Sequence, residues 1–549
     1  MKNNIFIVIV FISISVFSQE KGNVTGGLES NAQWYLNDKE LDFSQPENPL
    51  RSNNYLFINY KYKNWLGGTQ VESYEKNALL NYNPAFKGTN IGTYFLEYKN
   101  DKIDITGGYF YEQFGSGLLY RSWEDRALGI NNALRGLRVI IKPTSYLTIK
   151  AINGKQRSGF DVANSTIYGL DTEVVLSDLF KMKTSELSFG ITYVGRDEKT
   201  DFVNPNFNRL TNAFAGRINF SRNAFYLTTE YDYKSKDAVV QVNQVSNSFV
   251  KPGSALVLNM GYSKKGFGLD GTFRRLENMS FFSEREANGN SYNDKIMGFI
   301  PSLTKQHHYN LANIYVYQAQ PNVLLSDESL VKAGEIGGQI DLFYNFKKGT
   351  KFGGKYGTKV AINYSNWHAL GGTFYLYSPQ DYKTDFLGFG KKYFSDINIE
   401  ITKKISDKLS TGFAYINQYN NLKLTTDTFG IVQTNIVAGE ATYKFNTTKS
   451  IRIQGEHMWA DSDKRNWAAS TVEYNFNSKF SVYASDMYNY GNLDGNDNHY
   501  YNVGSAFRKN STRIALSYGR QRGGLVCVGG VCRIVSESSG ISLSLNSTF

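Results

Sequence analysis

Histidine is the side chain most often used for acid–base catalysis near neutral pH, and the chain contains five of them. None stands in a pattern that defines a catalytic site, because the HExxH zinc motif, the GxSxG nucleophile motif and a phosphate-binding loop are all absent. His457 follows Glu456 and imitates a hydrolase pair, but a histidine near the end of a strand is more often structural. The sequence therefore predicts no catalytic residue and no enzyme.

Oxygen-bearing side chains that could bind a metal are concentrated in one segment, Asn492 to Asn498, which reads NLDGNDN. An EF-hand calcium loop continues to a glutamate that binds the ion with both oxygens, and this segment has no such glutamate. A turn rich in asparagine, aspartate and glycine is the simpler interpretation. No metal site and no cofactor are predicted.

The two cysteines stand in the stretch CVGGVC, at positions 527 and 532. A two-residue turn at Gly529-Gly530 would place Cys527 opposite Cys532 across a hairpin, since glycine accepts positive φ at both positions. A redox or metal pair would need a CxxC spacing or further ligands. We expect a structural disulfide at a loop tip, worth about 2 kcal/mol, in an oxidising compartment.

The elements around these residues are strands, recognised by a hydrophobic period of two. The N-terminal example sets one apolar face against one polar face: Val24, Leu28, Ala32, Trp34 and Leu36 against Thr25, Glu29, Asn31 and Gln33. The same alternation recurs near residues 336–345, 437–445 and 512–519. Mean hydropathy is only −0.40, but membrane barrels keep such low averages because only alternate residues face lipid.

The connections between the strands alternate between short and long. Residues 99–102, 142–145 and 263–266 form short turns, whereas residues 37–52, 75–90, 112–136, 196–208, 235–253, 280–334 and 367–390 form long loops. Short periplasmic turns and long extracellular loops are typical of outer-membrane barrels. Counting segments by this rule predicts an all-β fold, a single transmembrane antiparallel β-barrel of about 24 strands (22–26) over residues 19–549.

Both ends of the chain carry targeting signals. Lys2, the apolar run Ile5–Phe17 and the small residue Ser18 predict a signal peptide over residues 1–18 and export to the outer membrane of a Gram-negative cell. The last strand is amphipathic and stops on Phe549, which resembles the signal read by the barrel assembly machinery. The predicted partners are therefore outer-membrane lipid and that machinery, and no nucleic acid.

Three stretches together resemble one family of barrels: the leader ending in Ser18-Gln19-Glu20, the segment YEQFGSGLLYRSWEDRALGINNALRG at residues 111–136, and the tip CVGGVCR at residues 527–533. They are similar to an uncharacterised outer-membrane β-barrel family of the Bacteroidota, classed as a domain of unknown function. The resemblance implies the barrel and its location over the whole mature chain. It implies no activity.

A barrel of this size is wider than the 16–18-stranded porins, which leave an aqueous channel. It must be open, plugged by its own loops or filled by a partner. The first strand begins near Val24, which leaves no room for the N-terminal plug domain of a TonB-dependent receptor. The long loops are then the plug material, and residues 280–334, with His307-His308, are one candidate whose placement stays open.

The segment Glu112–Gly136 is the first candidate for a constriction loop. Gly115 and Gly117 permit a sharp inward turn, and Ser122 with Asp125 predicts a capped short helix over Ser122–Leu134. The candidate constriction residues are Trp123, Glu124, Asp125 and Arg126, and the candidate lumen-wall residues are Glu97 and Arg138. An extracellular cap is the alternative to an inward fold.

The formal net charge of +11 gives little guidance to a substrate. Basic turns such as Lys347-Lys348 account for much of it, and inward-parity residues carry both signs, which argues against a strongly selective anion pore. The favoured function is a porin-like pore or uptake channel for small hydrophilic solutes. The alternatives are a non-catalytic scaffold or accessory subunit with an outer-membrane or surface-protein partner, and, second, an outer-membrane hydrolase.

Overall fold

The structure is a computed structural model that describes residues 22–199, 208–241, 244–287, 292–493 and 497–549. The expected signal peptide, residues 1–18, lies outside the described residues.

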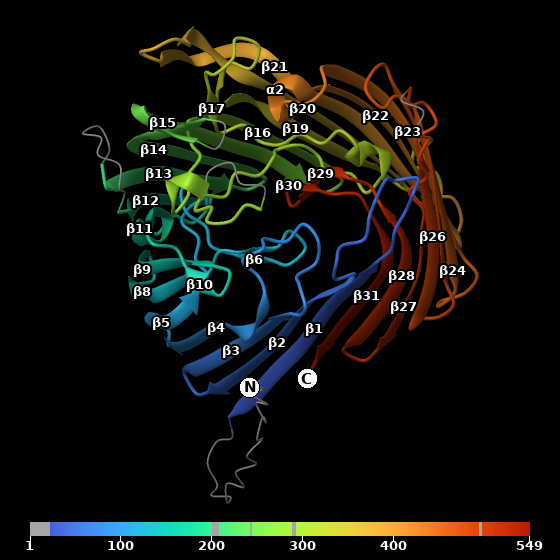
Figure 1. Cartoon of the computed structure of the whole chain (residues 1–549), viewed down its shortest axis with the longest axis horizontal. Coiled ribbons are helices and arrows are strands. Elements are labelled where there is room, and N and C mark those ends of the chain that lie inside the picture. The colour runs from blue at the N-terminus through green and yellow to red at the C-terminus, as the bar shows by residue number, and fades with distance from the viewer. Residues whose placement is uncertain (1–21, 200–207, 242–243, 288–291, 494–496) are drawn as a thin grey trace, which may run out of the picture.

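The chain forms a closed antiparallel barrel of 24 strands (Figure 1). Strand β1 pairs with the last strand, β31, from Gly27 opposite Thr548 to Tyr35 opposite Gly540, which closes the ring and leaves no free edge. The barrel strands are β1 (Asn23–Tyr35), β2 (Leu50–Tyr62), β3 (Trp65–Tyr74), β4 (Gly88–Lys99), β5 (Ile103–Phe110), β8 (Leu134–Thr144), β9 (Leu147–Ser158), β11 (Thr166–Val175), β12 (Ser185–Asp197), β13 (Leu210–Arg222), β14 (Phe225–Gln241), β15 (Gln244–Lys264), β16 (Phe267–Glu277), β19 (Glu335–Phe346), β20 (Thr358–Tyr375), β21 (Asp381–Lys404), β22 (Leu409–Asn421), β23 (Ile431–Lys444), β24 (Ser450–Ala460), β25 (Trp467–Asn475), β26 (Phe480–Tyr488), β27 (Asn502–Lys509), β28 (Thr512–Gln521) and β31 (Ser538–Thr548). The predicted fold and strand number are confirmed.

Short elements occupy the connections. The strands among them are β6 (Glu124–Asp125), β7 (Ile130–Asn131), β10 (Asp161–Val162), β17 (Val323–Leu324), β18 (Lys332–Ala333), β29 (Gly524–Val528) and β30 (Val531–Val535). The helices are α1 (Leu176–Leu179), α2 (Leu422–Thr426) and the 3₁₀ turns η1 (Arg285–Ala287) and η2 (Leu311–Asn313). Within the described ranges, no helix is long and apolar enough to cross a membrane.

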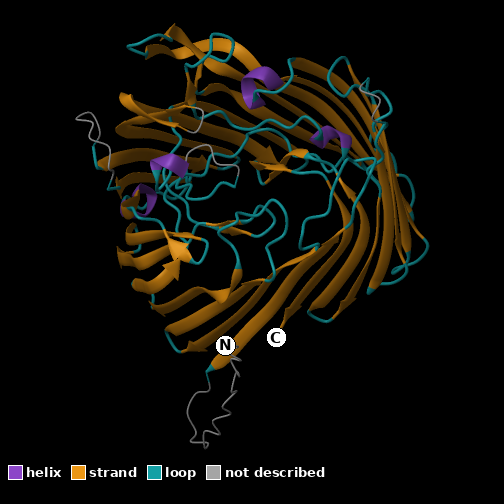
Figure 2. Ribbon diagram, in the orientation of Figure 1, coloured by secondary structure: helices purple, strands orange, loops and turns teal. Residues whose placement is uncertain are grey.

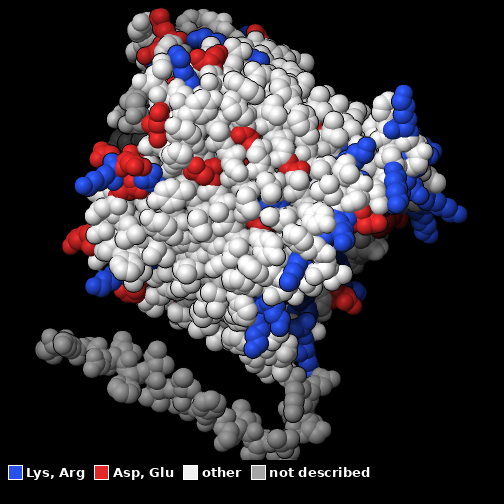
Figure 3. Space-filling view, turned by 90° about the vertical axis from the view of Figure 1, so that its right-hand side faces the viewer, with Lys and Arg blue, Asp and Glu red and all other residues white. Residues whose placement is uncertain are grey.

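The outward side chains make a lipid-facing surface. Along β13, Phe214 is 48% exposed, while its neighbours Ala213 and Ala215 are buried toward the lumen. The same alternation places Phe413 and Tyr415 of β22 outward. Figure 3 shows that charged side chains gather toward the edges of one outer face, with mostly uncharged surface between them. This pattern is that of an outer-membrane-type barrel, because lipid accepts apolar and aromatic groups but not charges.

Much of two expected loops is strand instead. Residues 235–241 and 244–253 continue β14 and β15, and residues 367–375 and 381–390 continue β20 and β21, with bulged pairing in both hairpins. The two hairpins contact each other, since the Lys251 ammonium donates to the Tyr382 carbonyl at 2.9 Å, and Phe249 packs against the Tyr382 ring. Pairing beyond the membrane is stable here because each hairpin buries apolar residues against the other.

The lumen is filled on one side by the chain's own loops (Figures 1 and 2). They are chiefly the β5–β8, β16–β19 and β28–β31 connections, and together we call them the plug. One apolar core joins Phe114, Leu118, Leu119 and Tyr120 with Met279, Phe281 and Met297 of the β16–β19 connection and with inward wall residues such as Ala213 and Ala255. A second core packs Tyr309, Leu311 and Tyr315 against inward residues of β22–β25. The inward face of the barrel is therefore partly apolar.

Candidate functional site

The segment after β5 lies inside the barrel, but it contains no helix. The amide of Asn132 donates to the Trp123 carbonyl at 2.9 Å, and β6 pairs with β7 in a small hairpin. Ser122 accepts a hydrogen bond from the amide of Glu112 at 2.9 Å and does not cap a helix. The predicted helix over Ser122–Leu134 is wrong, because pairing across the hairpin satisfies the same backbone groups.

Arg126 fixes this hairpin to the wall. Its guanidinium lies 2.7 Å from Glu29 of β1 and 3.0 Å from Glu124, and donates to Gln70 of β3 at 2.9 Å. It also stacks 4.2 Å from the centre of the Tyr55 ring. A charged turn is thus held across the lumen by contacts to three wall strands.

The other predicted constriction residues face different neighbours. Trp123 packs edge-on against Phe299 of the β16–β19 connection, with 5.5 Å between ring centres. Asp125 accepts from the amide of Leu128 at 3.0 Å and makes a local turn. Of the four, Arg126 and Glu124 contact the barrel wall, Trp123 contacts the β16–β19 connection, and Asp125 bonds within its own segment.

The predicted wall residues pair with each other. Arg138 lies 3.4 Å from Glu97 and 2.7 Å from Asp104, and it approaches Glu112 at 3.9 Å. These predicted wall residues therefore meet the start of the segment and not its charged turn. Arg126 and Arg138 nevertheless line one cavity of about 370 Å³. That this segment sets the width of the conducting passage stays a prediction.

The predicted disulfide forms between Cys527 and Cys532, which stand opposite each other in the β29–β30 hairpin. The hairpin lies within the lumen and packs on the β16–β19 connection. The Ser302 amide donates to the Gly530 carbonyl at 2.8 Å, and the Asn293 side chain donates to the Cys532 carbonyl at 2.9 Å. The disulfide therefore braces a piece of the plug.

We expect both cysteines to resist thiol labelling on intact cells until they are reduced, because the bond is formed and Cys532 is buried. A C527S/C532S variant should still assemble, since a six-residue closure contributes only about 2 kcal/mol. Maleimide labelling with and without reductant, followed by heat-modifiable gel migration, measures both effects. Labelling of unreduced cells would contradict the disulfide.

Two cavities lie between the lumen loops and the wall made by β28, β31 and β1. One of about 580 Å³ lies toward the long loops and the other, of about 620 Å³, toward the short turns. They share Gln33 of β1 and Ser542 of β31 in their linings. The two cavities are thus adjacent along the closing seam of the barrel.

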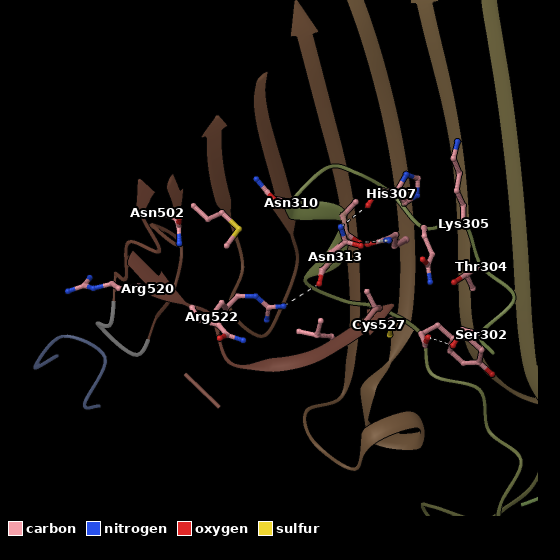
Figure 4. Close-up of a pocket in the computed structure, with 18 of the residues that line it drawn as sticks. Ser302, Thr304, Lys305, His307, Asn310, Asn313, Asn502, Arg520, Arg522 and Cys527 are labelled. Carbon is pink, nitrogen blue, oxygen red and sulfur yellow. Dashed lines mark hydrogen bonds between the residues drawn. The ribbon is translucent and has the colours of Figure 1, made fainter. Parts of the chain in front are cut away.

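The cavity near the loops joins plug and wall residues (Figure 4). His307 lies 3.6 Å from both Asp396 and Glu400, and Lys305 lies 2.9 Å from Glu400. Burial lowers the pKa of His307, but its interactions with these two carboxylates outweigh burial and raise the pKa overall. His307 thus joins the plug to β21 as part of a charge cluster.

The described residues of the remaining sequence candidates do not line the cavities given above. The His457 ring shares a 2.7 Å hydrogen bond with the Tyr490 hydroxyl. The candidate calcium segment falls partly outside the described residues, at 494–496, and no group of three metal-binding side chains occurs among those described. Phe549 pairs with Gly26 through two backbone hydrogen bonds at 2.9 and 3.0 Å, and its ring is exposed.

Sequence inspection missed Glu335, the first residue of β19. It is fully buried and accepts from the Tyr317 hydroxyl at 2.6 Å, the Gln320 amide at 2.7 Å and Arg274 at 2.5 Å. It therefore holds the plug to the wall. In the sequence, Arg274 could have indicated this contact, because an arginine that faces the barrel interior needs a carboxylate partner.

Solved structures similar to this chain are outer-membrane proteins at low identity. The siderophore receptor PirA from Pseudomonas aeruginosa is 8% identical with a TM-score of 0.42, and the match covers 97% of this chain and 81% of that one. The transporter YddB from Escherichia coli is 9% identical with a TM-score of 0.40, over 98% and 81%. The outer membrane protein opdK from Pseudomonas aeruginosa is 9% identical with a TM-score of 0.36, over 76% and 97%.

No curated protein matches the chain. A family model matches residues 1–549 in full. The chain belongs to DUF6029, a family of unknown function.

Proposed function

We propose that the protein is an outer-membrane pore for small hydrophilic solutes, with the passage along the β28–β31–β1 wall. The observation that carries this proposal is the pair of adjacent cavities at the closing seam. Along β28, Gly519 lines the loop-side cavity and Arg513 the turn-side cavity. These residues are six positions apart, which corresponds to roughly 20 Å of strand. Because barrel strands tilt by about 40°, this spans roughly 15 Å of an apolar band about 25 Å tall.

The lining of this wall explains why space remains there. Inward positions of the seam strands carry small polar side chains, among them Ser505, Ser517, Ser542 and Ser544. Small hydroxyl groups occupy little volume and hydrogen-bond to water. On the opposite wall, apolar inward residues such as Ile152 and Val194 are covered by the plug. Two stretches of wall, β9–β16 and β22–β25, therefore anchor the plug, and the seam strands leave a path for water.

The size of the cavities sets the size of the solute. Volumes of about 580 and 620 Å³ fall in the range of pockets that enclose small ligands, roughly 300–1,000 Å³. A folded protein or a long polymer would not pass without movement of the plug. Small water-soluble molecules are the class that fits.

Purified protein in planar bilayers should show discrete single-channel conductance, and liposomes that contain it should swell in small sugars but not in large oligosaccharides. Heat-modifiable gel migration would establish that the barrel is folded in the same sample, and cell fractionation should recover it with the outer membrane. A folded barrel that neither conducts nor swells liposomes would contradict the pore.

A scaffold or accessory-subunit role is the second candidate, favoured by the projecting β20–β21 hairpin. Tyr377 is 80% exposed and Leu387 is 62% exposed at its outer end. Exposed apolar groups beyond the membrane are typical of partner-binding surfaces. Native pull-down from membranes distinguishes the two roles, because a stoichiometric surface protein would favour the scaffold and its absence the pore.

Export and insertion follow from the chain ends in this proposal. Residues 1–18 would direct export, and Phe549, at the end of an amphipathic strand, would be read by the barrel assembly machinery.

A further inference from the structure

We propose that the passage favours small anions with carboxylate or phosphate oxygens, and that Arg522 and Arg533 are the two residues that bind them. This inference rests on the proposed pore and names its solute class. Both arginines belong to the connection between β28 and β31: Arg522 precedes β29, and Arg533 lies in β30 next to Cys532 of the disulfide. Arg522 lines the loop-side cavity and Arg533 the turn-side cavity.

Arg522 points into the loop-side cavity beside Asn313 (Figure 4). Its guanidinium donates to two backbone carbonyls, Gly523 at 2.9 Å and Asn313 at 3.2 Å. No carboxylate of the described chain lies within ion-pair distance of it, and Glu537 acts on it only from further away. A guanidinium has five N–H donors, so several remain for a bound solute.

Arg533 repeats this arrangement in the turn-side cavity. It donates to the carbonyls of Asn81 and Leu128, each at 3.1 Å, and lies 5.5 Å from the centre of the Tyr82 ring. The described residues place no carboxylate within ion-pair distance, and Asp125 contributes only a longer-range attraction. Burial lowers the pKa of both Arg522 and Arg533, which remain charged but lack the water that would solvate them.

Other charges at the loop-side cavity are already paired. Arg520 lies 2.6 Å from Asp38 and 2.7 Å from Glu40, and its side chain extends away from Arg522 in Figure 4. Lys305 and His307 face the carboxylates of Glu400 and Asp396. The mixed signs on the wall thus largely cancel in pairs, which leaves Arg522 as the uncompensated charge.

In the turn-side cavity, Arg126 is paired with Glu29, and also with Glu124, which lies outside the lining of this cavity. Glu473 and Arg513 both line it, one of each sign, and so contribute no net charge. Arg533 is therefore the uncompensated charge of the second cavity. An anion that moved between the cavities would meet one desolvated guanidinium in each, with small polar wall residues between them.

The oxygens of a carboxylate or phosphate suit these positions. A guanidinium binds two such oxygens with parallel hydrogen bonds, and a charge-assisted bond in a partly dewatered cavity is stronger than a neutral one. The carbonyls that hold each arginine orient it without neutralising it. A neutral sugar would gain less, and a cation would be repelled.

Reversal potentials across a potassium chloride gradient test the selectivity. The parent should favour chloride over potassium, and R522Q and R533Q should each reduce that preference by several-fold, with the double variant near neutrality. Micromolar to millimolar acetate or phosphate should reduce chloride current, with an apparent affinity about tenfold weaker in R522Q because one charge-assisted contact is lost. R522K should fall between, since it keeps the charge without the paired donors.

R209Q is the matched control, because Arg209 pairs with Asp197 in an exposed position and lines neither cavity. It should leave the reversal potential unchanged. Acetate and phosphate are tested separately, and inhibition of the chloride current by only one of them identifies the anion class. A conducting parent without anion preference, or arginine variants with unchanged selectivity, would overturn this inference alone. A folded parent without conductance would overturn the pore and the inference together.

Discussion

Replacing Glu124–Asn131 by two glycines should raise single-channel conductance by about twofold or more, because a barrel this wide leaves an aqueous channel wherever no loop fills it. The replacement is geometrically simple, since the Trp123 carbonyl and the Asn132 amide are already joined by a 2.9 Å hydrogen bond. It removes Arg126 and with it the contacts to Glu29 and Gln70. It keeps Phe114–Tyr120, which pack in the apolar core.

Conductance in planar bilayers and the sensitivity of cells to large antibiotics measure this effect, and both should rise together. The control replaces Lys347–Gly357 by Asn-Gly, a shortening on the turn side between the paired residues Phe346 and Thr358. It should leave conductance unchanged. If the deletion has no effect on conductance but a surface partner is lost, the segment is a docking element. If neither protein conducts, the proposed pore is contradicted, and the β16–β19 connection is the remaining candidate for closing the lumen.

Glu335→Ala should destabilise the plugged barrel by about 3–5 kcal/mol, because it leaves the buried Arg274 without its carboxylate. It also removes the acceptor for the Tyr317 hydroxyl and the Gln320 amide. The plug between β16 and β19 should loosen, and channel recordings should become noisier. The midpoint of loss of the heat-modifiable band in urea or on heating measures the stability.

Glu40→Ala is the control for that experiment. Glu40 also pairs with an arginine, at 2.7 Å from Arg520, but its side chain is 71% exposed. Exposed pairs contribute about 0–1 kcal/mol, so the midpoint should move little. Glu335→Gln keeps an acceptor and should fall between. Equal effects of Glu335→Ala and Glu40→Ala would show that Glu335 does not hold the plug.

The barrel could be predicted from the sequence because the signal is local and repeated. Each membrane strand alternates residues for lipid and lumen, as Phe214 does between Ala213 and Ala215, and a sheet of such strands must close to satisfy its edges. The disulfide was equally accessible, since Gly529-Gly530 specifies the register of Cys527 and Cys532 without distant contacts.

The interior could not be predicted in the same way. Ser122 and Asp125 have the spacing of a helix cap, but residues far away in sequence decide their conformation: Arg126 contacts Glu29 and Trp123 packs on Phe299. The apolar cores depend on which inward alanines and isoleucines face which loop, and a period of two contains no such information. The role of Glu335 could not be predicted for the same reason, because all of its partners are brought to it by the tertiary structure.

The contacts of Arg533 have a consequence for the order of biogenesis. Its bond to the Leu128 carbonyl joins residues 405 positions apart, and the hairpin beside it also supports Ser302. A contact between residues this far apart in sequence forms late, because the chain between them must first close into a loop at an entropic cost. The plug is therefore completed only when the last connection is in place, so strands can insert around an unfinished interior. The plug is completed at the moment the ring itself closes.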